Sequence, residues 1–129
     1  MKPTITAIAL AAALVPAFAH AGEVIAHPSV TLTMSEIRDV FLGERQFAGP
    51  VRLMPIDNAA IQGEFLAKVL QTDEPKYAAR WLRKSFREGL APPPLKNSDA
   101  EVAAFVNSTP GAVGYVSKRM GGVKVLEEF

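Results

Sequence analysis

The sequence predicts a small α/β protein: a mixed, mostly parallel sheet flanked by helices. Short apolar runs of strand type, such as residues 23–26 and 51–54, alternate with segments whose apolar residues recur at helical spacing. The expected order is strand, helix, strand, three helices, strand, strand, without a repeat or a domain boundary. Alternation at the start predicts that the first two strands form a parallel pair joined by a right-handed crossover.

The first 21 residues predict a secretory signal peptide. Lys2 precedes an apolar run over residues 5–18, and residues 19–21 (AHA) form a small-x-small cleavage site. A transmembrane helix is the alternative, but Pro16 interrupts the run, which is shorter than the ~20 residues that a span needs. Cleavage after Ala21 leaves one domain, residues 22–129. The leader is of bacterial type, so we expect a periplasmic protein.

Composition argues against several classes of function. The chain has 14 Lys+Arg and 13 Asp+Glu, so removing Lys2 leaves 13 of each and a net charge near zero. This balance argues against nucleic acid as the main partner. The absence of cysteine excludes disulfides, thiol catalysis and Cys-ligated metals. His27 is the one histidine beyond the leader, so we expect no metal site, no cofactor and no enzyme activity.

Local signals set the boundaries of the first elements. Thr33 and Glu36 form a capping box for a helix that Gly43 stops. Pro55 has no N–H and is expected to end the second strand. Asn58 is expected to cap a helix that runs to about Leu70, with its apolar residues on one face.

The second half of the chain begins with a longer helix. Thr72 or Asp73 caps it, and Gly89 closes it. Its expected buried side is Tyr77, Ala78, Trp81, Leu82 and Phe86.

A stiff connector and three short elements complete the chain. Residues 91–94 (APPP) form an extended connector. Ser98 begins a short helix through a second capping box. Residues 112–116 and 123–126 are the last strands, and the final one is expected to be antiparallel at an edge.

The stretch 51–65 is where we first expect a ligand. A strand that runs into a helix N-terminus presents backbone N–H groups and a helix dipole, both of which attract anions. The candidate ligand-binding residues are Asp57, Asn58, Ala59, Ala60, Ile61 and Gln62. Alternatively, Asp57 is a capping or turn carboxylate, and Asn58 and Gln62 are solvated helix residues.

A second candidate surface is basic. Five cationic residues fall within about a third of the helical circle, opposite the apolar face around Trp81. They are Lys76, Arg80, Arg83, Lys84 and Arg87. The pattern indicates either a solvated face balanced by nearby acids or a docking surface for an acidic partner or anionic headgroups.

Four segments resemble the phosphate-binding proteins of bacterial ABC transporters. Residues 32–44 (LTMSEIRDVFLGE) are similar to that family's L-T-…-I-F-x-G segment, and residues 108–116 (STPGAVGYV) to its T-P-G-x-I-G-Y-V. The strand-turn-helix at 51–65 and the aromatic helix around Trp81 also match. The resemblance implies a single small lobe of a periplasmic-binding-protein-like fold. Hinge closure of two lobes around a ligand is not available to one lobe.

The resemblance also shows what this chain lacks. The family's phosphate loop, R-x-D-G-S-G-T followed by an aromatic residue, falls on residues 55–61 and Phe65. Asp57 and Phe65 match, but Pro55 replaces the arginine, and Ala59 and Ile61 replace the hydroxyls. Each lost donor to a charged ligand removes ~1.5–3 kcal/mol, whereas micromolar affinity amounts to only ~8 kcal/mol. Backbone amides remain as weak anion donors.

Two functional hypotheses follow. In the first, the chain is a periplasmic solute-binding-like protein that holds a small oxyanion weakly, alone or with a protein that supplies a second lobe. In the second, it is an adaptor or sensor accessory that has lost ligand binding and docks through the basic helix onto a membrane transporter or sensor protein. The sequence predicts neither the ligand nor the oligomeric state.

Overall fold

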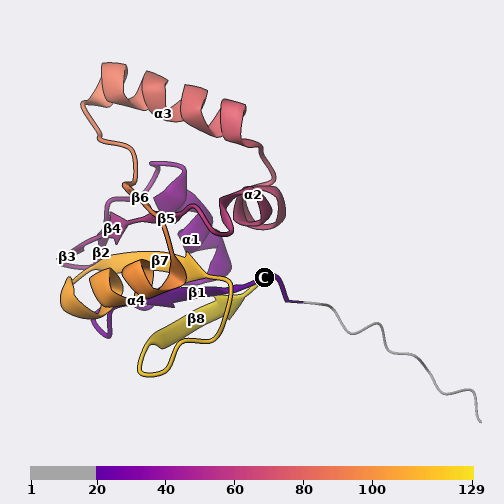
Figure 1. The fold of residues 1–129 in the computed structure, drawn as a ribbon. Helices are drawn as coiled ribbons and strands as arrows, with labels where there is room; N and C mark the ends of the chain where they lie inside the picture. Colours follow the sequence, from indigo (N-terminus) through magenta and orange to yellow (C-terminus); the bar gives the residue numbers. More distant parts are fainter. Residues whose placement is uncertain (1–19) are drawn as a thin grey trace, which may run out of the picture.

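Residues 20–129 are described by a computed structural model (Figure 1). The predicted signal peptide lies, apart from its last two residues, outside the described residues. At the predicted cleavage point, the N–H groups of Ala21 and Gly22 both donate to the carbonyl oxygen of Phe129. Within the described part of the chain, no helix is long and apolar enough to cross a membrane.

The main sheet has four strands in the order β4-β7-β1-β8. They are β1 (Glu23–Ala26), β4 (Met54–Pro55), β7 (Ala112–Val116) and β8 (Lys124–Glu128). Strand β1 is antiparallel to both β7 and β8, whereas β4 is parallel to β7. The predicted mixed α/β class is therefore confirmed, but the expectation of a mostly parallel sheet is wrong. The final strand lies antiparallel at an edge, as predicted.

The predicted parallel pair between the first two strands does not form. All five residues of β7 are buried, and this strand lies between β4 and β1. Burial leaves its backbone groups without water on either edge, so they need a neighbouring strand on each side. The alternation rule considers only neighbours in sequence and therefore misses this insertion of a strand from the far end of the chain.

The predicted strand 51–54 divides between two sheets. Strand β3 (Val51–Arg52) forms a hairpin with β2 (Phe47–Ala48), and β4 joins the main sheet. Pro55 does not end the ladder, because the donors are its neighbours: the N–H of Met54 donates to the carbonyl of Gly111, just before β7, and that of Ile56 to the carbonyl of Val113. A third, two-stranded sheet pairs β5 (Asp57–Asn58) with β6 (Leu95–Lys96) in parallel.

The helix after the turn begins later than predicted. Helix α2 (Gln62–Phe65) continues as the π-helix η1 (Leu66–Leu70). Asn58 is not its cap: the residue before the helix is Ile61, which makes no side-chain cap. Asn58 instead holds a turn, because its Oδ1 accepts from the N–H of Ala60 and its carbonyl from that of Ile61. The expected apolar face of this segment is buried nonetheless.

The caps of the other helices are confirmed. Helix α1 (Met34–Phe41) has the complete Thr33–Glu36 capping box. Helix α3 (Glu74–Glu88) begins after Asp73, whose side chain accepts from the N–H of Lys76, and ends at Gly89 with φ 68°. In α4 (Asp99–Ser108), the Ser98 hydroxyl accepts from the N–H of Glu101, so Ser98 is the predicted cap. The second capping box is incomplete, because the Glu101 carboxylate accepts from the N–H of Asn97 instead of that of Ser98.

The sheet has an apolar core on each face, with different helices covering the two. Alternate residues of a strand point to opposite faces, so Val24 and Tyr115 belong to one core and Ile25 and Val116 to the other. Helix α4 covers the second core, and α1 and α2–η1 contribute to the first. Helix α3 lies beyond them as an outer element (Figure 1).

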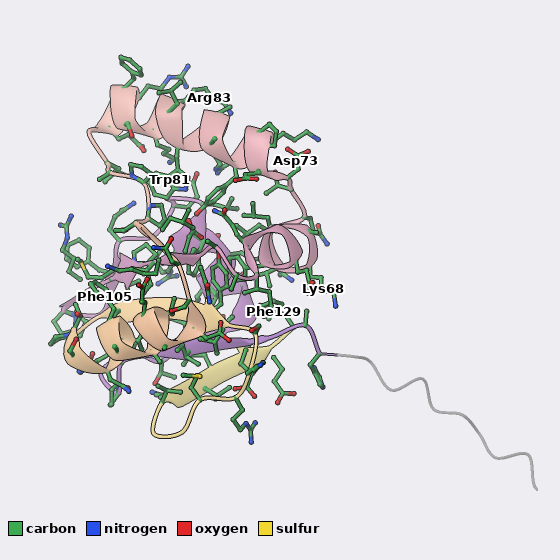
Figure 2. All side chains as sticks on the ribbon, viewed as in Figure 1. Lys68, Asp73, Trp81, Arg83, Phe105 and Phe129 are labelled. Atoms are coloured by element: carbon green, nitrogen blue, oxygen red, sulfur yellow. The ribbon has the colours of Figure 1, made fainter. Side chains whose placement is uncertain are left out.

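The predicted buried side of α3 is correct only for two aromatic residues. Tyr77 and Trp81 are buried, but Ala78 is exposed, Leu82 is 61% exposed and Phe86 is 85% exposed. In Figure 2, Trp81 points toward the body and Arg83 points away from it. The prediction was wrong because α3 packs on the body through a narrow stripe, which leaves the adjoining apolar side chains uncovered.

Candidate functional site

The backbone amides predicted to bind an anion already have partners within the chain. The N–H of Ala59 donates to the carbonyl of Lys96 at 2.8 Å. The N–H groups of Ala60 and Ile61 both donate to Asn58, at 3.0 Å to Oδ1 and 3.2 Å to the carbonyl. These three donors are therefore not free to bind an oxyanion, and the helix that follows has only four residues.

Asp57 is buried beneath α3 and bound by two tyrosines. It is 2% exposed, and its two oxygens accept from the hydroxyls of Tyr77 and Tyr115, each at 2.8 Å. Burial raises the pKa of Asp57 to about 6, although the two tyrosine hydrogen bonds act in the opposite direction. No cation forms an ion pair with it in the described chain. Asp57 therefore joins α3 to the sheet, a role that neither sequence alternative included.

Asn58 is also an internal connector. Its Nδ2 donates to Asp99 Oδ1 at 2.8 Å and to the carbonyl of Tyr115 at 3.0 Å. Burial alone would raise the pKa of Asp99, but hydrogen bonds from Ser117 and Asn58 outweigh it and leave this pKa below its ordinary value. Asn58 thus ties β5 to β7 and to the start of α4. Of the six predicted ligand residues, Gln62 is half-buried and lines a groove beside α3.

Three of the five predicted docking cations are paired with acids. Arg80 Nη2 lies 2.7 Å from Glu44 Oε1, and Arg80 Nε donates to the carbonyl of Leu42. Lys84 pairs with Glu44 at 3.1 Å and with Glu88 at 3.0 Å, and it is the main reason that the pKa of Glu44 is lowered. Lys76 lies 3.6 Å from Asp73. These three cations therefore fit the first of the two sequence alternatives, a solvated helix face whose charges are balanced by nearby acids.

The other two cations, Arg83 and Arg87, are exposed and form no ion pair with any described residue. They line a depression of about 270 Å³ that also contains Arg80, Lys84, Glu44 and Glu88. Four cations and two carboxylates leave an excess of two positive charges there. Leu82 and Phe86 each precede one of the free arginines in sequence, and at about 100° per residue this places an apolar stripe beside a basic one.

The apolar stripe continues into a groove. Leu82 lines a cavity of about 330 Å³ together with Pro93 and Leu95, and Leu95 is itself 53% exposed. Asp57 and Tyr77 also contribute to its wall. Four residues, Leu82, Arg83, Phe86 and Arg87, form what we call the outer side of α3. This surface therefore combines uncovered apolar groups with uncompensated positive charge.

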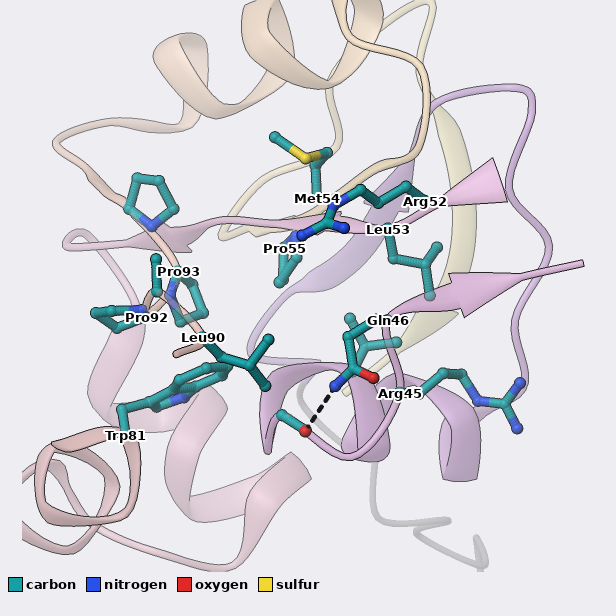
Figure 3. Close-up of a pocket in the computed structure, with 14 residues that line it drawn as sticks. Arg45, Gln46, Arg52, Leu53, Met54, Pro55, Trp81, Leu90, Pro92 and Pro93 are labelled. Carbon is teal, nitrogen blue, oxygen red and sulfur yellow. Dashed lines mark hydrogen bonds between the residues drawn. The ribbon is translucent and has the colours of Figure 1, made fainter. Parts of the chain in front are cut away.

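A separate pocket also has Trp81 in its wall (Figure 3). It has a volume of about 240 Å³ and is bounded by the residue 90–94 connector, the end of α1 and the β2–β3 hairpin. Sequence reasoning missed it, because its walls come from segments 40–55, 81 and 90–94. Its one sequence signal is the stiff proline connector.

Comparison with protein-family models and with curated proteins found no match. The resemblance to phosphate-binding proteins therefore rests on the four sequence segments alone.

Proposed function

We propose that this chain is an exported, non-enzymatic interaction protein of the periplasm that docks onto an acidic partner protein through the outer side of α3. One observation carries the proposal: Leu82 and Phe86 are exposed beside Arg83 and Arg87, which have no acidic partner in the described chain. The partner expected is a protein such as a transporter or sensor subunit, with an apolar depression bordered by carboxylates.

Energetics support docking at this surface. Burying a Leu or Phe side chain stabilises by about 1.5–3 kcal/mol, so two such side chains can contribute much of a moderate affinity. Arginine is also enriched among the residues that dominate binding energy, and both arginine and phenylalanine are enriched at interfaces. Arg83 and Arg87 would direct an acidic partner into register through long-range attraction.

An oxyanion-receptor function has less support. The side-chain donors of the phosphate loop are absent from the sequence, and three of its backbone donors are used internally. We keep the relation to a periplasmic-binding-protein-like lobe in the proposal for the fold only, and not for ligand binding. The first two predicted strands form no parallel pair, which counts against that relation.

The test is a double charge reversal with a matched control. Arg83→Glu/Arg87→Glu alters the free arginines, whereas Arg80 is unsuitable because it holds Glu44 and the end of α1. Lys68→Glu/Lys118→Glu makes the same change in charge at two exposed lysines outside α3. Each purified variant is compared with the wild type in recovering a partner from periplasmic extract.

We expect the wild type and the lysine control to recover the same protein and the arginine variant to lose it. Acid-to-lysine changes in that protein should then restore binding to the arginine variant, which identifies a direct contact. Equal recovery by the arginine variant, with an unchanged melting temperature, would contradict docking through α3.

A further inference from the structure

The pocket beside Trp81, called here the Trp81 pocket, has mostly apolar walls. Leu53, Leu90 and Trp81 form part of it, and the proline connector closes one side (Figure 3). The indole is fixed from behind, because Trp81 Nε1 donates to the carbonyl of Phe41 at 3.0 Å. The Trp81 pocket is therefore a preformed apolar surface rather than one that must be assembled around a ligand.

The charges on this pocket are all of one sign. Its lining contains two arginines, Arg45 and Arg52, and no acidic residue. Arg45 pairs with Glu36 at 3.4 Å and points away from the other lining residues in Figure 3. Arg52 has no ion pair with a described residue, and its guanidinium carbon lies over the face of the Phe47 ring, 5.9 Å from the ring centroid. In Figure 3 its side chain turns toward Pro55, so a guanidinium without a counterion borders the apolar cavity.

The size of the cavity limits what can enter. At about 240 Å³ it exceeds the ~150 Å³ apolar cavity that accommodates benzene, but it is smaller than the ~300 Å³ at the lower end of drug-sized sites. A single ring or a short branched chain therefore fits. Carboxylates and phosphates both match a guanidinium through two parallel hydrogen bonds, and the mostly apolar lining with one free arginine favours the singly charged carboxylate.

We propose that the Trp81 pocket binds a small monocarboxylic acid with a compact apolar body. The body packs against Trp81, Leu53 and Leu90, and the carboxylate accepts from the Arg52 guanidinium. This site goes beyond the proposed docking function, since neither Arg83 nor Arg87 lines the pocket.

The protein contains its own reporter for this site. Trp81 is the single tryptophan of the chain, so fluorescence excited where only tryptophan absorbs reports on this one side chain, which lines the Trp81 pocket and also the groove beside α3. Three probes separate the two halves of the ligand. Benzoate has both the ring and the charge, benzamide has the same shape without the charge, and phosphate has charge without an apolar body. Each is titrated against the purified protein, and melting temperature provides a second readout, since a ligand of the folded state raises it.

Variants then assign the contact. Arg52→Gln should weaken benzoate binding by at least about tenfold while changing the melting temperature of the free protein little. Arg45→Gln is the matched control and should bind benzoate like the wild type. Ala91→Phe fills the cavity from an exposed lining position and should abolish binding.

The expected result is a saturable change in Trp81 fluorescence with millimolar or lower benzoate, a weaker one with benzamide and none with phosphate. Arg83→Glu/Arg87→Glu should bind benzoate normally, so this proposal and the docking proposal fail separately. The proposal is overturned if benzoate changes neither fluorescence nor melting temperature, if benzamide binds as tightly, or if Arg52→Gln has no effect.

Discussion

Replacing Asp57 with asparagine should stabilise the protein, and more so as the pH rises. The carboxyl group is buried between two tyrosine hydroxyls without a cation. Asparagine has nearly the same shape and can still accept from one tyrosine. It removes a buried negative charge that the fold does not neutralise.

The magnitude follows from the pKa of Asp57, which burial raises from 3.8 to about 6. A raised carboxyl pKa means that the folded state favours the protonated form. The stabilising contribution is complete below the unfolded value of 3.8 and is lost as the pH rises through about 6. A difference of about two in pKa corresponds to about 3 kcal/mol. The advantage of Asp57→Asn over wild type should thus grow by about this amount across the window.

The assay is urea unfolding followed by Trp81 fluorescence, at several pH values between about 4 and 8. The pKa of Asp99 is lowered from 3.8, so Asp99→Asn is a control of opposite sign with a lower window. The difference between wild type and Asp99→Asn should stay nearly constant across this pH range, and wild type should lose stability relative to Asp99→Asn only below about pH 4. A free-energy difference between Asp57→Asn and wild type that is flat, or that shrinks with rising pH, would refute the assignment of an uncompensated buried charge.

Four further outcomes are expected. Millimolar phosphate should leave the melting temperature unchanged, because a bound anion would raise it. Trp81→Ala should cost about 3–5 kcal/mol in urea unfolding, whereas Phe86→Ser, at an exposed position, should change stability by less than about 0.5 kcal/mol. Gly111→Ala should destabilise far more than Gly122→Ala; both glycines have positive φ, but only at Gly111 would the new Cβ meet a backbone oxygen, at 2.0 Å. Mass spectrometry of periplasmic protein should find Gly22 as the first residue; a chain that keeps the leader would contradict the predicted cleavage.

Sequence patterns located the elements whose signals are local. The Thr33–Glu36 box and the Asp73 cap act within one helical turn, so they can be recognised without knowing the fold. The predictions that were wrong concern residues whose structure depends on partners far away in the sequence. Pro55 is tolerated because its neighbours donate to carbonyls in and just before β7, more than fifty residues away. Leu82 has helical periodicity, but nothing in that periodicity says how wide a stripe of α3 the body covers.

In the candidate site too, local patterns identified residues, but distant partners determine what those residues do. The turn pattern singled out Asp57, but the partners that define its role, Tyr77 and Tyr115, lie 20 and 58 residues further along the chain. The basic residues of α3 were recognised from their spacing. Which of them remain unpaired depends on Glu44, which belongs to the loop after α1. The Trp81 pocket could not be predicted, because no local pattern brings Arg52 beside the proline connector.

The most direct test of docking through α3 is a photo-crosslinking scan in living cells. A photoreactive amino acid is placed at one exposed position at a time: Phe86, then Gly63 near the predicted anion-binding loop, then Lys118 in the loop between β7 and β8. The account predicts one discrete adduct at position 86 that Arg83→Glu/Arg87→Glu removes. An adduct of equal yield at position 63 or 118, with none at 86, would contradict it.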